Sequence, residues 1–120
     1  DWDAALMAYG TGSGKESAEY SYLVESDGAK AGSGYIASKR VFRKLRDNFL
    51  ESAKRLGEDG APAYDAAGDI HWNTLHREGR WFLFYPKLGY QAIGLSDIGG
   101  THMTEHCSGA DEDGSYCIRT

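Results

Sequence analysis

The chain has 120 residues, of which 41% are hydrophobic and 12% aromatic, and its formal net charge at pH 7 is -5. This length suits one domain with a core of its own, and the composition excludes a disordered polar chain. No apolar run approaches the roughly 20 residues that cross a bilayer, so the sequence contains no candidate transmembrane helix. We expect a single domain over residues 1–120.

The N-terminal third is rich in glycine and contains one clear strand pattern. Residues 1–9 are apolar, but so short a run does not distinguish a helix from a strand. Residues 10–17 (GTGSGKES) are expected to form a flexible loop. The alternation of Tyr20, Tyr22 and Val24 predicts a strand over residues 18–25.

A glycine-rich connection leads from there to residues 38–56, which carry the strongest helical pattern. Ser38 is the expected N-cap, and Gly57 is expected to end the helix in the left-handed conformation. The apolar stripe is too wide to remain in water, so we expect it to pack on a sheet. This stripe consists of Val41, Phe42, Leu45, Phe49, Ala53 and Leu56. The opposite side carries cations, namely Lys39, Arg40, Arg43, Arg46 and Lys54.

The positive charge of the chain is concentrated in this helix. Residues 38–56 contain seven Lys or Arg residues against Asp47 and Glu51, a balance of +5, whereas the other residues carry a balance of -10. Such a helix could steer the molecule toward an anionic surface, or it could be balanced by carboxylates of the same chain. The sequence leaves both alternatives open.

Three strands are predicted after the helix. Residues 70–75 (IHWNTL) would place Ile70, Trp72 and Thr74 on one side of a strand. Residues 80–85 (RWFLFY) are apolar on both faces and are therefore expected at the centre of the sheet. Residues 90–95 (YQAIGL) form the third, and the short turns between these strands indicate antiparallel pairing.

The C-terminal part is expected to add a short helix, capped by Ser96 or Thr101 and running through Cys107, and a last strand over residues 115–120. This order of elements predicts an α+β fold. We expect a single-domain sandwich in which an antiparallel sheet of four to five strands carries one long amphipathic helix and one or two short helices on one face.

The chain has two cysteines, Cys107 and Cys117. Glycines between them make the segment flexible enough to close a disulfide in an oxidising compartment. A loop of about ten residues would add roughly 2–3 kcal/mol to the free energy of unfolding. The sequence therefore favours a disulfide and, with it, a secreted protein.

Two histidine patterns suggest alternative chemistry. His102, Glu105 and His106 match H-x-x-E-H, which on a helix would place both imidazoles on one face as metal ligands. Glycines just before this motif are a poor start for a helix, so surface or structural histidines are the preferred interpretation. No metal or other cofactor is expected.

The second pattern consists of His71, His76, Glu78 and Arg80. These residue types could supply the base, the acid and the cation that a small metal-independent ribonuclease needs around one phosphate. Their arrangement depends on cross-strand register, which the sequence does not reveal.

From residue 40 onward the chain presents the amphipathic helix, the tryptophan segment IHWNTL, the segment GRWFLFY, then IGLSDI, a short helix and a glycine segment that closes on Cys117. This order resembles the small secreted fungal proteins of the killer-toxin and Ecp2-like effector group. The resemblance implies an α/β sandwich, secretion, and toxicity toward competing cells or a role at a host surface. It identifies no catalytic residues.

We therefore expect a secreted toxin- or effector-like protein that binds a component of a target-cell surface or membrane through the basic side of its helix. A second subunit is a further candidate partner, and nucleic acid is not expected because the body of the chain is acidic. The alternative is a small hydrolase or ribonuclease that uses the histidine patterns above.

Overall fold

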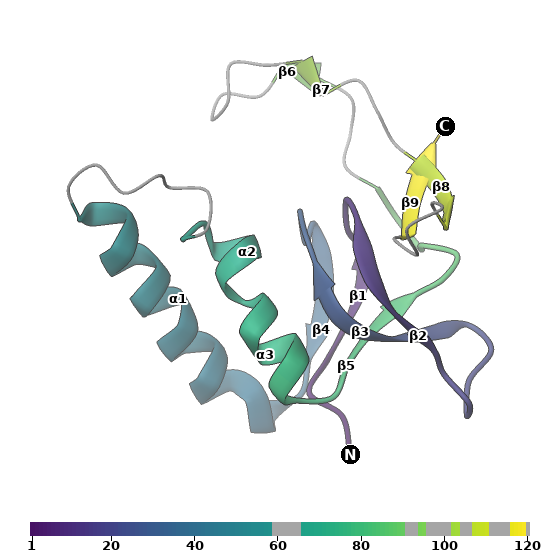
Figure 1. Cartoon of the computed structure of the whole chain (residues 1–120), viewed down its shortest axis with the longest axis horizontal. Helices are drawn as coiled ribbons and strands as arrows, with labels where there is room; N and C mark the ends of the chain where they lie inside the picture. Colours follow the sequence, from purple (N-terminus) through teal and green to yellow (C-terminus); the bar gives the residue numbers. More distant parts are fainter. Residues whose placement is uncertain (59–65, 91–93, 96–101, 104–106, 111–115, 120) are drawn as a thin grey trace.

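The computed structural model describes residues 1–58, 66–90, 94–95, 102–103, 107–110 and 116–119, with side chains up to residue 90. The fold is α+β, as the sequence predicts: a mostly antiparallel open sheet of five strands carries a helix of 19 residues and a helix of 11 residues. Figure 1 shows the two helical segments lying side by side next to the sheet.

The sheet has the order β4-β1-β5-β3-β2, in which β1 and β5 are parallel and the other neighbours antiparallel. Its strands are β1 (Ala4–Ala8), β2 (Gly12–Glu16), β3 (Leu23–Ala29), β4 (Gly34–Ala37) and β5 (Trp81–Phe84). A hairpin extends the edge at β2 through the pair Gly12 and Tyr116. This hairpin consists of β8 (Cys107–Ala110) and β9 (Tyr116–Arg119). Two short strands, β6 (Gly94–Leu95) and β7 (His102–Met103), pair with each other.

The central position predicted for RWFLFY is confirmed, because β5 lies between β1 and β3. Trp81 and Leu83 are buried beneath the helices, whereas Phe82 between them is buried on the other face. A strand that buries side chains on both faces has to be apolar at every position, which explains its sequence.

The loop predicted over residues 10–17 is wrong, since most of this segment forms β2. Its glycines are required by close approach rather than by flexibility. A side chain at Gly12 would collide with Leu83, and one at Gly14 would collide with the backbone of Glu25. The strand predicted over residues 18–25 begins only at Leu23 and continues into the expected glycine-rich connection.

The long helix is confirmed. A 3₁₀ turn, η1 (Lys39–Val41), leads into α1 (Phe42–Gly57), and the Ser38 hydroxyl accepts a hydrogen bond from the amide of Arg40 as an N-cap. The predicted left-handed end is wrong. Gly57 is the last residue of α1, and the extended residue Glu58 occupies the C-cap position.

The strand predicted over residues 70–75 is also wrong, because this segment is helical. It forms α2 (Gly68–His71) and α3 (Asn73–Glu78). Trp72, Leu75 and His76 are buried at helical spacing, and the Trp72 indole donates a hydrogen bond to the Ala29 carbonyl oxygen on β3 (3.1 Å).

The short helix predicted through Cys107 is wrong at the described positions, where β7 and β8 are strands. Residues 96–101 and 104–106 lie outside the described part of the chain. Of the strand predicted over residues 90–95, Gly94 and Leu95 form β6, whereas residues 91–93 lie outside the described part of the chain. The antiparallel pairing predicted between this strand and residues 80–85 is wrong, because β6 pairs with β7 and β5 pairs with β1 and β3. The last predicted strand corresponds to β9.

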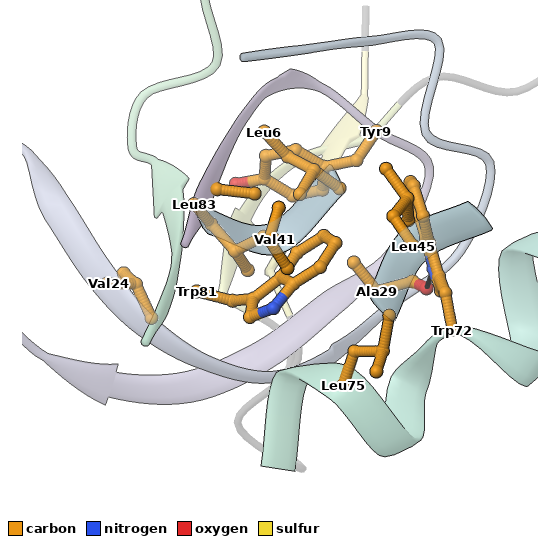
Figure 2. Packing of buried hydrophobic residues seen from close by; sticks show 11 residues of the cluster. Leu6, Tyr9, Val24, Ala29, Val41, Leu45, Trp72, Leu75, Trp81 and Leu83 are labelled. Atoms are coloured by element: carbon orange, nitrogen blue, oxygen red, sulfur yellow. Dashed lines mark hydrogen bonds between the residues drawn. The ribbon is translucent and has the colours of Figure 1, made fainter. Parts of the chain in front are cut away.

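One cluster of buried side chains joins the helices to the sheet (Figure 2). It consists of Ala4, Leu6, Tyr9, Val24, Ala29, Val41, Leu45, Trp72, Leu75, Trp81 and Leu83. Trp72 is central to it, with its ring edge-on to Trp81 at a centroid distance of 5.6 Å. The apolar area buried in these contacts stabilises the fold.

The buried side of α1 differs from the predicted one. The buried positions are Leu45, Asn48 and Ser52, together with Val41 in η1, whereas Ala53 is exposed, Phe42 is 56% exposed and Leu56 is 44% exposed. Phe49 is 36% exposed and lies at the margin, with its ring 6.2 Å from Trp72. The helix is therefore rotated relative to the expectation, and part of its apolar stripe remains in water.

Candidate functional site

The side of α1 opposite the core is an exposed ridge. Arg43, Arg46, Leu50 and Lys54 follow one another at spacings of three or four residues and therefore share this side of the helix. All four are exposed, and Leu50 is 62% exposed. We call these four residues the outer ridge of α1.

The five cations predicted to make contacts are all exposed, but they differ in their partners. Arg40 pairs with Asp3 (2.8 Å) and approaches Asp1 (3.7 Å). Arg46 pairs with its neighbour Asp47 (2.7 Å). Within the part of the chain that the structure describes, the remaining three make no ion pair; they are Lys39, Arg43 and Lys54.

Exposed apolar side chains flank the outer ridge. Phe42, Phe49 and Leu56 recur every seven residues, and this spacing places them on one flank of α1 between the buried side and the ridge. The helix thus presents cations and uncovered apolar groups together, which sequence reasoning missed because it assigned these apolar residues to the core.

The predicted histidine set is only partly brought together. His76 and Arg80 line one cavity, whereas His71 and Glu78 are not among its lining residues. His76 is 1% exposed, and Glu78 and Arg80 are exposed. The base, acid and cation of the ribonuclease interpretation therefore do not converge on one phosphate position.

His76 forms a buried hydrogen bond with Ser26 of β3 (2.7 Å between the hydroxyl oxygen and Nδ1). Its ring stacks on the Trp81 indole at a centroid distance of 4.2 Å. Burial lowers the pKa of His76 to about 3. The charge of Asp27 opposes this effect by raising the pKa, and the charge of Arg77 lowers it further. The imidazole is therefore neutral at pH 7 and is a weak base.

The cavity next to His76 has a volume of about 280 Å³ and lies beside the N-terminal end of β5. It brings together charged residues from β2, β3, α3 and the turn before β5: Lys15, Glu25, Asp27, Arg77 and Arg80. Lys15, Ser26, Asp27 and Arg77 carried no signal in the sequence, because their proximity depends on strand register.

A second concave surface lies on the sheet face opposite the helices. It has a volume of about 300 Å³, and its lining is largely aromatic, with Trp2, Tyr20, Tyr22, Phe82 and Phe84. Tyr22 stacks on Phe84 at a centroid distance of 6.1 Å. The sequence did not identify this surface. Tyr20 and Tyr22 were interpreted only as part of a strand pattern, and Trp2, Phe82 and Phe84 are distant from them in the sequence.

The predicted metal motif lies largely outside the described residues: Glu105 and His106 are not described, and His102 is described only as backbone of β7. Where side chains are described, no three His, Cys, Asp or Glu residues are grouped closely enough to hold a metal ion. The side chains of Cys107 and Cys117 also lie outside this part, so their disulfide remains a prediction.

Comparison with known proteins finds no similarity: no family model matches the sequence, and no curated protein or solved structure matches it significantly. Among the described helices, none has the length and apolar character needed to span a bilayer.

Proposed function

We propose that this chain is a binding protein that docks on an anionic lipid surface through the outer ridge of α1 and the apolar flank beside it. The observation that carries the proposal is the combination of unpaired cations with uncovered apolar groups on one helix. Arg43 and Lys54 make no ion pair within the described residues, and Leu50 lies between them in the sequence. Helices at membrane interfaces combine these two properties.

The distribution of charge supports the same orientation. The helix segment carries a balance of +5 on a body with a balance of -10. An anionic surface attracts α1 and repels the rest of the chain, so the molecule would approach with its helix first. In Figure 1, α1 lies at the outside of the molecule, with α2 and α3 beside it and the sheet beyond them.

The resemblance to secreted toxins and effectors is consistent with this proposal. Docking on a foreign cell would require secretion, which belongs to the proposal together with the disulfide between Cys107 and Cys117. The hydrolase alternative is less well supported, because His76 is buried and neutral and because His71 and Glu78 do not line its cavity.

The proposal is tested by co-sedimentation of the purified protein with vesicles of phosphatidylcholine alone or mixed with phosphatidylserine. We expect binding to the mixed vesicles only, and we expect it to weaken as salt rises. Arg43→Glu should reduce partitioning roughly tenfold or more, because each basic residue near such a surface contributes about 1 kcal/mol.

Two matched controls keep this test specific. Lys15→Glu changes the net charge by the same amount on β2 and should leave binding almost unchanged. Leu50→Ser should weaken binding, whereas Leu88→Ser, at a leucine that is 66% exposed on a loop, should not. Equal loss in Arg43→Glu and Lys15→Glu would show that net charge alone acts. Binding to a protein or to a second copy, without vesicle binding, would also overturn the proposal.

A further inference from the structure

The cavity beside His76 lies where two neighbouring strands separate. β3 and β5 pair from Leu23 and Phe84 as far as Glu25 and Phe82. Beyond that point β3 continues alongside β2, and the backbone of Arg80 instead bonds to Asp3, with its amide donating to the carboxylate and its carbonyl accepting from the Asp3 amide. The separation leaves room for a cavity of about 280 Å³.

Two buried ring nitrogens, on His76 and Trp81, belong to residues that line this cavity. The Ser26 hydroxyl oxygen accepts from the Gly28 amide (3.2 Å) and lies closer to His76 Nδ1 (2.7 Å) than to the Gly28 carbonyl oxygen (3.3 Å). The 2.7 Å contact fits either tautomer of the neutral imidazole; in the arrangement that leaves a free donor, the Ser26 hydroxyl donates to Nδ1 and the imidazole carries its proton on Nε2. Neither His76 Nε2 nor Trp81 Nε1 has an acceptor among the described residues.

These two donors are unusual in a well-packed core. His76 and Trp81 are each 1% exposed, and their rings are stacked. A buried donor without an acceptor costs roughly 1–3 kcal/mol, so two such groups beside one cavity favour an occupant that carries acceptor atoms.

The charges around the cavity indicate the sign of that occupant. Three cations, Lys15, Arg77 and Arg80, face two carboxylates, Glu25 and Asp27. The Asp27 carboxylate already accepts from the Ser13 hydroxyl, whereas Lys15 and Arg77 make no ion pair within the described residues. The volume is at the lower end for ligand sites, which suits a compact anion.

We propose that this cavity binds a small phosphate-type oxyanion, held by the N–H groups of His76 and Trp81 and by the charges of Lys15 and Arg77. The site is separate from the outer ridge of α1, and it does not depend on membrane docking.

The test is a titration of ¹⁵N-labelled protein with inorganic phosphate, at constant ionic strength maintained with sodium chloride. We expect the Trp81 Nε1–H resonance to shift saturably at millimolar phosphate. The Trp72 Nε1–H resonance is the internal control, because its proton is already donated to Ala29. Sulfate should compete, and a soluble phosphate monoester should produce the same shift as inorganic phosphate.

Variants at exposed positions identify the site without disturbing the core. Arg77→Ala and Lys15→Ala should each lower the affinity for phosphate about tenfold, whereas Arg43→Glu should leave it unchanged. A Trp81 resonance that phosphate does not move would overturn the proposal, as would a shift that persists unchanged in Arg77→Ala and Lys15→Ala. A shift produced only by phosphatidylserine vesicles would assign the effect to the bilayer and overturn it as well.

Discussion

A buried imidazole that stays neutral makes the stability of a protein depend on pH. The pKa of His76 is lowered to about 3, from the usual value of 6.5 that the unfolded chain retains. Between these two values the unfolded chain binds a proton that the folded chain does not. The free energy of unfolding should therefore fall as the pH drops from 6.5 toward 3, with His76 contributing about 1.4 kcal/mol for each pH unit.

This contribution is measured as a difference between variants, because carboxylates titrate in the same range. Urea unfolding at pH 7, 6, 5 and 4 should show a steeper loss of stability in the wild type than in His76→Gln, because glutamine has no ionisable group at this position. Parallel slopes in the wild type and His76→Gln would mean that His76 is accessible to water and protonates normally.

Single residues could be predicted where local chemistry decides their role. Ser38 caps the helix because its hydroxyl reaches the amide of Arg40, and this depends only on neighbours in the chain. Gly12 could not be predicted in the same way. It is a glycine because the side chain of Leu83 approaches it from the distant strand β5, and a sequence pattern does not encode that approach.

At the scale of elements, periodicity identified α1 but not the side on which it is buried. Asn48 and Ser52 face inward because α1 packs beside α2, where carbonyl groups require donors. Asn48 Nδ2 donates to the His71 carbonyl oxygen (3.3 Å) and to Thr74 Oγ1 (3.2 Å), and the Ser52 hydroxyl donates to the Ala66 carbonyl oxygen (2.5 Å). A hydrophobicity pattern assigns such polar residues to the solvent side, so the predicted buried side of α1 was rotated away from the observed one.

The short helices show a related limit. Over six residues, IHWNTL fits a period of 2 as well as it fits a helix. The deciding contact is the hydrogen bond from Trp72 to Ala29, 43 positions earlier in the chain. Tertiary packing therefore overrode the local preference.

The interface between α1 and α2 makes a prediction about Asn48. Its Oδ1 has no partner among the described residues. Asn48→Leu removes the two hydrogen bonds that Nδ2 donates, which is unfavourable, and it also removes this unpaired buried acceptor, which is favourable. The free energy of unfolding should therefore change by less than about 1 kcal/mol. Asn48→Asp buries a negative charge, and no ion pair among the described residues supplies a cation beside it. This substitution should therefore lower the free energy of unfolding by roughly 3 kcal/mol. Urea unfolding at pH 7 measures both.

Asn73→Asp is the matched control for this comparison. Asn73 accepts a hydrogen bond from the Ala29 amide through Oδ1, and an aspartate would keep that acceptor. Its cost should therefore be smaller than that of Asn48→Asp. The opposite order would show that Asn48 lies in water and that α1 does not pack on α2 as described.

At the scale of the whole molecule, the sequence predicted the layers but not the places where segments meet. The order of elements was enough for an α+β sheet with helices on it, because few arrangements bury an amphipathic helix and apolar strands together. The cavity beside His76 arises where β3 leaves β5, and β5 itself pairs with β1 from the opposite end of the described chain. Register between such distant strands has no local signal.

The shared core predicts that the helices and the sheet unfold together. Val41 and Leu45 of the helical region, Trp72 at the junction of α2 and α3, and Leu83 of β5 belong to one cluster. Far-ultraviolet circular dichroism, which follows the helices, and tryptophan fluorescence should therefore give coincident urea transitions. Leu83→Ala should shift both curves together and cost about 2–5 kcal/mol, because Leu83 is fully buried. Leu88→Ala should change stability by less than about 0.5 kcal/mol.

If α1 unfolded before the tryptophan signal changed, the helix would be attached to the core rather than part of it. The exposed apolar flank would then reflect weak packing instead of a docking surface.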